Sequence, residues 1–343
     1  MNEVSDLHEP EHDFRKSELI NKWDFLTALS NRRLNVQSLG QNIILGWSID
    51  RITIVGKLRQ SILIERDGQY LTVNFEMLMS LSQDGGFVEQ KSYNSWQIFD
   101  KYHENLAYIE VLKFQKGHGR IDFNPNKIDL FVAGGMKTFI HKLFTQPHFS
   151  RADIACDIIN APNDFVNQYR IIAPVSVKAY YGRNKELETA YWGARSSELQ
   201  VRMYNKHLEQ SKKRQVIPKD VKTWWRVEMQ LRRGKATDWH DMVNKNLENF
   251  CSPHYFPLGL KWTDRVMLTG LLSDENLWSG LSRNSKYKYR NLLKLENQND
   301  ELTQAMKQTF LEQSQELKDE LDSWLIGLDV TDEDEKSHHW NDG

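Results

Sequence analysis

The sequence predicts an α+β fold, in which a mainly antiparallel sheet with packed helices is followed by a smaller, mostly helical C-terminal region. Two observations lead to this prediction. Apolar and polar residues alternate with period two in many short segments, which is the pattern of strands with one buried face. Segments with helical spacing interrupt these strands only a few times before residue 250 and dominate after it. The chain of 343 residues, 39% of them hydrophobic, is long enough for one large domain or two moderate ones.

Three segments alternate most clearly: Arg151–Ile158, 198–206 and Trp224–Arg232. In the second segment, the apolar Val201 and Met203 share one face. Arg202, Tyr204 and Lys206 share the other, because successive side chains of a strand point to opposite faces. Each segment therefore predicts a strand with an apolar face toward the core and a charged face that carries reactive groups.

The remaining elements are predicted from the same two periods. Segments rich in Ile, Val and Tyr predict strands over 49–55, 61–65, 70–75, 107–114, 120–123 and 176–181. A glycine turn at 116–119 joins two of them, 107–114 and 120–123, into a hairpin. Helical spacing predicts helices over 127–144, 163–171, 207–214, 237–250, 260–272, 276–282, 287–295 and 301–325.

Composition and turn residues suggest four parts. Residues 1–47 are expected to form an acidic segment with short helical turns, and 48–250 the main domain. Pro253 and Pro257 mark the start of a helical region over 251–328. The acidic residues 329–343 are expected to form a disordered tail.

The charge is unevenly distributed although the net charge is only -2. Residues 176–235 contain 15 Lys and Arg against 6 Asp and Glu, whereas 291–343 contain 4 against 14. This asymmetry indicates a basic working surface and an acidic tail, and the alternative is two solvated faces whose charges happen to balance.

The sequence also argues against several classes of protein. No stretch approaches the roughly 20 apolar residues of a membrane span, and the acidic N-terminus is not a signal peptide. The two cysteines, Cys156 and Cys251, offer no disulfide framework. A cytoplasmic protein without a membrane partner is therefore expected. There is no phosphate-binding GxxxxGK[ST] loop for an ATP-driven helicase, and no strand carries a pair of histidines for a metal-dependent nuclease site.

The charged faces of the three clearest strands suggest a reaction centre if the strands share a sheet. They carry Tyr204, Asp153, Asp157, Glu228, Arg202 and Arg226. Carboxylates hold hard divalent cations, and such a cation stabilises charge on a phosphate. A tyrosine can act as a covalent nucleophile, and arginines grip phosphate oxygens. The alternative is that these are ordinary solvated faces of half-exposed strands.

The same segments resemble the Rep_trans family of rolling-circle plasmid replication initiators, which is related to conjugative-element relaxases. The resemblance spans roughly residues 49–232 and is carried by GRIDFNPNK (119–127), SRADIACDI (150–158), TAYWGARSSELQVRMYNK (189–206) and WWRVEMQLR (224–232). Its most specific part is the R-x-Y-x-K pattern, followed about twenty residues later by R-x-E.

The resemblance implies a mechanism and partners. Tyr204 would nick one strand of origin DNA and form a 5′-phosphotyrosyl link. Asp153, Asp157 and Glu228 would hold Mg²⁺ or Mn²⁺. The cations Arg202, Arg226 and Lys206 would stabilise the phosphate and activate the phenol. The implied partners are double-stranded or hairpin single-stranded origin DNA, a host helicase and a second copy of the chain.

A second basic segment is expected to contact DNA. Residues 283–290 contain four cations, two tyrosines and no acid. Cations neutralise phosphates and tyrosines pack on sugars or bases, so we predict that Arg283, Lys286, Lys288 and Arg290 bind DNA. By analogy with the family, this region would recognise the origin. Lys127 is a further candidate, although a turn before a helix explains it equally well.

Two alternative functions remain open at this point. One is a conjugative relaxase with the same chemistry acting on a transfer origin. The other is an origin-binding protein that keeps the fold but does not cut DNA. Substitution of Tyr204 by phenylalanine distinguishes an enzyme from a binder.

Overall fold

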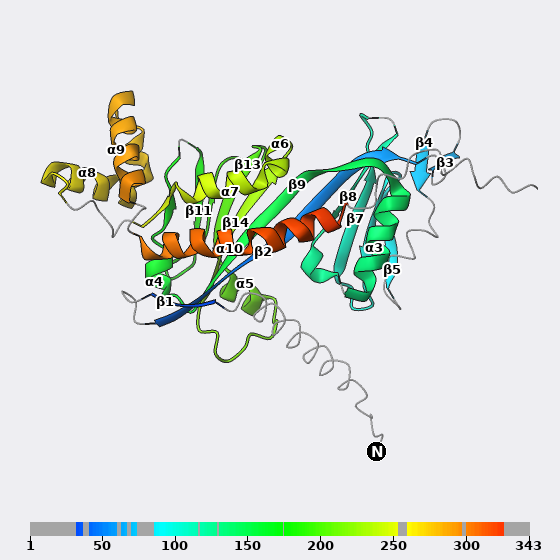
Figure 1. The fold of residues 1–343 in the computed structure, drawn as a ribbon, viewed down its shortest axis with the longest axis horizontal. Helices are drawn as coiled ribbons and strands as arrows, with labels where there is room; N and C mark the ends of the chain where they lie inside the picture. The colour runs from blue at the N-terminus through cyan, green and yellow to red at the C-terminus, as the bar shows by residue number, and fades with distance from the viewer. Residues whose placement is uncertain are drawn as a thin grey trace, which may run out of the picture. The chain divides into compact units, whose positions relative to one another are not determined.

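The computed structural model describes residues 32–36, 41–59, 63–66, 70–73, 86–115, 117–128, 130–173, 175–252, 259–296 and 300–325. The described residues form two compact units. The first contains residues up to Ser48 together with Ala155–Met229 and His240–Gln313. The second contains Ile49–Ile154, Gln230–Trp239 and the part of the chain from Ser314 on. Figure 1 shows the mixture of strands and helices, which confirms the predicted α+β class.

In the first unit, the strands follow the order β11-β12-β13-β14-β9-β2, and β1 pairs with the start of β2. Their bounds are β11 Val177–Tyr181, β12 Leu187–Trp192, β13 Leu199–Asn205, β14 Trp224–Arg232, β9 Phe144–Ile159, β2 Gln41–Leu58 and β1 Arg32–Val36. The β11–β12 and β12–β13 pairs are antiparallel. Because β13, β14 and β9 are neighbours, the three strands with the clearest alternation share one sheet, as the candidate site required.

The helices of the first unit are α4 Asn163–Val166, α5 Lys206–Lys212, α7 Trp239–Leu247, α8 Trp262–Ser273, α9 Arg283–Glu296 and the start of α10 Glu301–Ser323, with the short 3₁₀ helix η4 Glu275–Trp278. Trp47 of β2 anchors α10 on the sheet. Its indole nitrogen donates to the Met306 carbonyl at 3.2 Å, and its ring meets Phe310 edge-on at 4.9 Å. The Phe310 ring also lies 5.3 Å from His240 at the start of α7, so α7, α10 and β2 pack together.

In the second unit, the strand order is β9-β2-β8-β7-β6-β5. The further bounds are β8 His118–Phe123, β7 Asn105–Val111, β6 Ser95–Phe99 and β5 Phe87–Ser92, while β3 Leu63–Arg66 pairs separately with β4 Tyr70–Val73. The helices are η3 Pro125–Lys127, α3 Leu130–Leu143, α6 Gly234–Thr237 and the end of α10. The antiparallel β7–β8 pair confirms the predicted hairpin.

Several predicted elements differ from the structure. Residues 41–47 form a strand rather than helical turns, so the boundary predicted at residue 47 falls inside β2. The predicted helix over 163–171 ends at Val166, because Tyr169 turns into the core and donates to Asp300 at 2.6 Å. Its last residues instead form β10 Arg170–Ile171, which pairs with β15 Phe250–Cys251.

Three other helix predictions were wrong in extent. The helix predicted over 237–250 is the shorter α7, Trp239–Leu247, which follows the separate α6, and 276–282 contains only the end of η4. Helix α9 begins at Arg283 rather than at residue 287, so the basic segment 283–290 is helical. The predicted acidic tail over 329–343 and most of the predicted segment over 1–47 lie outside the described residues.

Both cysteines belong to the core. Cys156 of β9 and Cys251 of β15 are 0% and 1% exposed, as expected for small core residues. Burial raises the pKa of both thiols well above the ordinary value. None of the described helices combines the length and the apolar character that crossing a membrane requires.

Candidate active site

Tyr204 lies on β13 beneath an arginine. Its side chain is only 2% exposed, and the Arg202 guanidinium carbon lies 3.7 Å from the centroid of its ring. Residues two apart on a strand share a face, so the long Arg202 side chain can fold over its neighbour. The alternation predicted a polar face for Tyr204, and the structure shows that this face is covered rather than open to solvent.

Lys206 lies on the other side of the tyrosine. Its ammonium donates a hydrogen bond to the Tyr204 hydroxyl at 3.3 Å. The strand ends here because Asn205 caps α5, its side-chain oxygen accepting from the Leu208 amide at 2.9 Å. Lys206 is thus the first residue of α5, and its ammonium contacts the phenol oxygen directly.

Glu209, one turn along α5, holds Lys206 in place. Its carboxylate lies 2.7 Å from the Lys206 ammonium and 3.1 Å from Lys213. Burial alone would raise the pKa of Glu209, but the hydrogen bonds and charges of the two lysines outweigh it and lower that pKa to about 2. The carboxylate therefore stays ionised at any physiological pH and keeps Lys206 beside the tyrosine.

Glu228 of β14 faces Arg202. It is 3% exposed, and its carboxylate lies 3.8 Å from an Arg202 terminal nitrogen. The Nε of Arg202 is buried and, among the described residues, has no hydrogen-bond partner. Leaving a buried donor without a partner costs free energy, so this guanidinium is suited to donate hydrogen bonds to an anion such as a phosphate.

Arg226 and Asp157 form a separate bidentate pair. Arg226 donates from Nε and Nη2 to the two carboxylate oxygens of Asp157, both at 2.7 Å. The Trp224 indole donates to the same carboxylate at 2.7 Å. Asp153, in the second unit, is similarly engaged by Arg151, whose Nε donates at 2.7 Å. Both predicted metal ligands of β9 are thus neutralised by arginines.

These pairs bear on the expected Mg²⁺ or Mn²⁺ site. A hard cation needs carboxylate oxygens that are not already occupied by guanidinium groups. In this conformation Asp153 and Asp157 do not fit that requirement, because both oxygens of each accept hydrogen bonds from an arginine. Within the described part of the chain, no three His, Cys, Asp or Glu side chains are grouped so that they could hold a metal ion.

The turn before β13 is fixed by its backbone. Gly193 has φ +95°, and a Cβ there would lie 2.7 Å from the Leu199 carbonyl oxygen, so only glycine fits. The Gln200 amide donates to the Gly193 carbonyl at 2.9 Å, and Ser197 donates to the Ala194 carbonyl at 2.6 Å. Gly193 and Ser197 therefore fix the turn that precedes β13, the strand that carries Arg202 and Tyr204.

Sequence reasoning missed several neighbours of the tyrosine. Tyr191 of β12 is paired with Arg202, whose guanidinium carbon lies 5.8 Å from its ring centroid. Tyr180 of β11 meets Tyr191 edge-on at 6.1 Å, and Lys178 lies 5.0 Å from the Tyr180 ring. The signal was present, since Lys178 and Tyr180 are two residues apart on a predicted strand.

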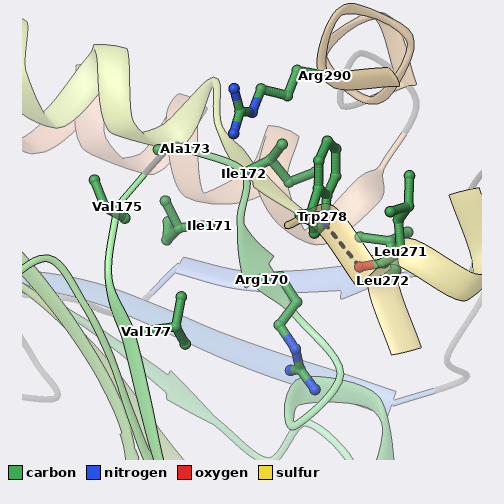
Figure 2. A pocket seen from close by; sticks show the side chains of 10 residues that line it. All are labelled: Arg170, Ile171, Ile172, Ala173, Val175, Val177, Leu271, Leu272, Trp278 and Arg290. Carbon is green, nitrogen blue, oxygen red and sulfur yellow. Dashed lines mark hydrogen bonds between the residues drawn. The ribbon is translucent and has the colours of Figure 1, made fainter. Parts of the chain in front are cut away.

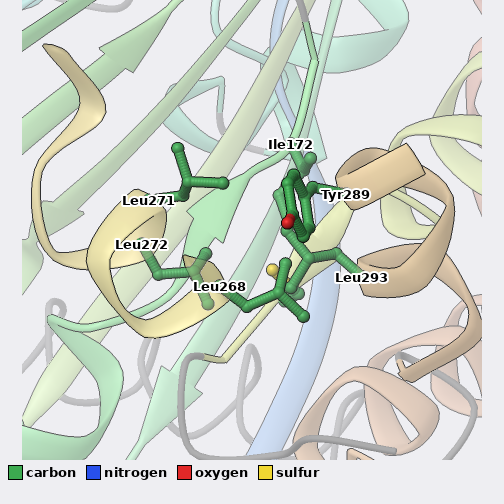
Figure 3. Close-up of a cluster of buried hydrophobic side chains, with 7 residues drawn as sticks. Ile172, Leu268, Leu271, Leu272, Tyr289 and Leu293 are labelled. Atoms are coloured by element: carbon green, nitrogen blue, oxygen red, sulfur yellow. The ribbon is translucent and has the colours of Figure 1, made fainter. Parts of the chain in front are cut away.

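The predicted DNA-binding cations lie on other elements. On α9, Arg283 is exposed, Lys286 donates to the Ser279 carbonyl at 3.4 Å, and Lys288 pairs with Asp264. Figure 3 shows the apolar side chains that join α8 to α9, including Leu268 and Leu293. Lys127, in η3 of the second unit, pairs with an acid, Glu104, at 3.2 Å.

Arg290 borders a cavity of about 120 Å³ between α8, α9 and the segment after β10 (Figure 2). Its guanidinium lies 5.3 Å from the ring centroid of Trp278, whose indole donates to the Leu271 carbonyl. Apolar side chains such as Ile172 and Leu272 line most of the cavity, so it belongs to the α8–α9 core rather than to the polar site around Tyr204.

Comparison with known proteins adds relatives. No family model matches the chain. A replication initiation protein of Staphylococcus aureus is 30% identical over 237 residues, which cover 68% of this chain and 73% of that protein. Another from the same organism is 28% identical over 304 residues, covering 87% and 90%. The solved structure of a rolling-circle replication initiator protein from Geobacillus stearothermophilus aligns with 67% of this chain and 96% of its own, with a TM-score of 0.40 and 14% identity.

Proposed function

Since this chain belongs to the family of replication initiation proteins, we propose that it starts rolling-circle replication by nicking one strand of origin DNA with Tyr204. The observation that supports this most is the setting of the tyrosine. One phenol is flanked by Arg202 on its ring and by Lys206 on its oxygen. Cations in this arrangement suit a nucleophile that attacks a phosphodiester.

The proposed step exchanges one phosphate ester for another. The Tyr204 oxygen attacks the scissile phosphorus, and the phenol proton passes to solvent. The bond from phosphorus to the 3′ oxygen breaks, and that oxygen leaves as a 3′-hydroxyl after taking a proton. The product is a 5′-phosphotyrosyl link, and because the diester is conserved, the reverse attack rejoins the strand without ATP.

The cations would act on different charges in this step. Lys206 stabilises the negative charge that develops on the phenol oxygen, to which it already donates. Arg202 has a buried Nε without a partner among the described residues and would donate to a phosphate oxygen. Arg226 is engaged by Asp157, so in this proposal it supports the site through that pair rather than by binding phosphate.

The metal requirement remains a prediction. If Mg²⁺ or Mn²⁺ takes part, it would neutralise charge on the scissile phosphate. Asp153 and Asp157 would each bind it only after the neighbouring arginine releases the carboxylate, and Glu228, which faces Arg202, would be the third ligand. A titration of nicking activity against Mg²⁺, Mn²⁺ and EDTA measures the requirement directly.

Origin recognition is proposed for α9. Arg283 and Tyr287 are exposed on this helix, and Tyr287 is 69% exposed. Phosphate contacts from Arg283, Lys286, Lys288 and Arg290 would position the helix on duplex DNA. The homodimer and the host helicase are expectations from the resemblance. The replication initiation proteins among the relatives favour replication over conjugative transfer as the purpose of the nick.

A nicking assay tests the proposal. Supercoiled plasmid carrying the element's own origin is incubated with the full chain and Mg²⁺ or Mn²⁺, denatured, and examined for protein on a 5′ end. We expect an adduct that maps to Tyr204 and disappears in Tyr204→Phe. Tyr181→Phe is the matched control, since this tyrosine is 60% exposed at the end of β11. Origin binding without any adduct would overturn the proposal. The protein would then be a non-catalytic origin-binding protein, the alternative function that the burial of Tyr204 supports.

A further inference from the structure

A row of aromatic and cationic side chains, exposed at its β11 end, leads from the edge of the sheet to Tyr204. We call it the edge row, and its members are Lys178, Tyr180, Tyr191 and Arg202. Strand pairing places Lys178 opposite Tyr191, and Tyr191 opposite Arg202. Residues paired across an antiparallel ladder share a face, and so do residues two apart on one strand. The whole row therefore lies on the same face as Tyr204.

The members of the edge row touch one another in sequence. Lys178 lies 5.0 Å from the Tyr180 ring centroid, and the rings of Tyr180 and Tyr191 are 6.1 Å apart at 80°. Arg202 then bridges two rings, at 5.8 Å from Tyr191 and 3.7 Å from Tyr204. All four distances are typical of cation–π or edge-to-face contacts. The row is thus continuous up to the candidate nucleophile.

The edge row is also accessible. β11 ends the strand order, and all five of its residues are exposed, with Tyr180 at 46%. Tyr191 is half-buried, and exposure falls further to Tyr204. The surrounding stretch 176–235 has 15 Lys and Arg against 6 Asp and Glu. A row that is open at one end, that carries Lys178 and Arg202, and that lies in a stretch with excess positive charge suits an anionic chain that enters from the edge.

We propose that the edge row binds single-stranded DNA and leads it to Tyr204. Lys178 and Arg202 would contact phosphates, and bases would stack on Tyr180 and Tyr191. Proteins that bind single strands combine cations along the backbone with aromatic rings under the bases, whereas the bases of a duplex are already stacked on each other. The binding itself is independent of the proposed nicking, but the direction toward Tyr204 rests on that proposed function.

A second copy of the chain is the other occupant that an exposed edge strand can take. Unpaired backbone groups on an edge can extend a sheet into a neighbouring molecule. A lysine on an edge strand disfavours such pairing, and Lys178 is exposed on β11. The charge of the row therefore favours nucleic acid over another copy.

Fluorescence anisotropy with the full chain tests this inference. The probe is a labelled oligothymidylate of about 16 nucleotides, in EDTA so that no cleavage occurs. We expect Tyr180→Ala and Tyr191→Ala each to weaken binding about tenfold, within the range of base–aromatic stacking, while Tyr180→Phe keeps its affinity. Tyr93→Ala is the matched control, because Tyr93 is 51% exposed and has Lys113 at 4.8 Å from its ring.

Three results would overturn the inference. The first is unchanged affinity in both alanine variants, and the second is an equal loss in Tyr93→Ala. The third is a change in oligomeric state of Tyr180→Ala by light scattering with unaltered DNA affinity, which would assign β11 to an interface between copies. Parallel nicking assays separate the two proposals: if the parent protein nicks while the variants bind normally, only the edge row is wrong. If the parent does not nick but the variants lose binding, only the chemistry is wrong.

Discussion

The Arg202 guanidinium lies 3.7 Å above the Tyr204 ring, and Tyr204 is only 2% exposed. A tyrosine in this position reaches a phosphate only when the guanidinium moves. Arg202 also faces Glu228 at 3.8 Å and has a buried Nε without a partner in the described part of the chain. We therefore expect Arg202 to leave the ring for the phosphate when DNA binds, which would uncover the nucleophile and neutralise its target together.

Replacement of Arg202 tests this coupling. Arg202→Gln should reduce the nicking rate about a hundredfold, because one charged donor to the phosphate is lost. Arg202→Lys should lose about tenfold, since an ammonium keeps the charge without the fork geometry. Rates are measured as the appearance of open circles. Arg195→Gln, in the exposed β12–β13 turn, is the control. Faster nicking in Arg202→Gln would mean that the arginine only covers Tyr204.

Glu209 should influence nicking through Lys206. Glu209→Gln removes the ion pair in which the Glu209 carboxylate lies 2.7 Å from the Lys206 ammonium. Because Lys206 is then less well positioned beside the phenol, we expect the nicking rate to fall about threefold to tenfold. The unfolding free energy should also fall, by on the order of 2 kcal/mol, because the two side chains are only 13% and 25% exposed and pairing lowers the pKa of Glu209 to about 2. Lys213→Gln is the control, since Lys213 also pairs with Glu209 but lies at the other end of α5 from Lys206. Equal losses in both variants would contradict a role through Lys206.

The ionisation of Glu209 also has a predicted pH dependence. Its pKa is about 2 in the folded chain and near 4.5 when unpaired, so its stabilisation is fully present above about pH 5 and is lost as pH falls toward 2. The nicking rate should therefore show no inflection from this group between pH 6 and 9. A rate profile of the parent protein beside Glu209→Gln over that range checks this, since a step present only in the parent would contradict it.

The Arg226–Asp157 pair is predicted to be structural. Removing one partner leaves a buried charge alone, so Asp157→Asn and Arg226→Gln should each destabilise the chain by about 3 kcal/mol in urea unfolding. The double variant should lose much less than the sum, because neither charge remains unpaired. If Asp157→Asn leaves stability unchanged but abolishes metal-dependent nicking, Asp157 is a metal ligand instead.

Glu320, in the second unit, predicts a stability change near neutral pH. Burial raises its pKa from 4.5 to about 7, against a smaller opposing effect of Lys137. Between about pH 4.5 and 7 the unfolded chain releases this proton while the folded chain keeps it, so the group lowers stability as pH rises. Glu320→Gln should therefore gain on the order of 2 kcal/mol at pH 8 and little at pH 4.5. Glu316→Gln, exposed on the same helix, should show no such difference.

The alternation of apolar and polar residues was enough to predict which side chains of the candidate site share a face of the sheet. The pattern over 198–206 correctly placed Arg202 and Tyr204 on one face of β13, and the neighbouring strands β14 and β9 share its sheet. Alternation gives the face of a side chain but not what lies over it. The stacking of Arg202 on Tyr204 and the pairing of Arg226 with Asp157 depend on side-chain torsions and strand order, which the sequence pattern does not contain.

Two errors concern where elements begin and end: the start of β2 and the end of the helix predicted over 163–171. Ile43, Leu45, Trp47 and Ile49 alternate and are all buried, yet the acidic segment before them suggested that β2 began later. The helix predicted over 163–171 failed because Tyr169 contacts Asp300, 131 residues away, and no local pattern reports such a contact. Local periodicity identified many of the strands but missed β5, β6 and β12, and tertiary contacts decided where the short helices end.

The burial of both cysteines makes this protein convenient for single-molecule work. Cys156 and Cys251 are the chain's two thiols, and burial keeps them protonated and slow to react. A cysteine introduced at Val177, which is 41% exposed on β11, would then take a maleimide dye selectively. A fluorophore at that position would report in real time when a strand arrives at the edge of the sheet and when it departs.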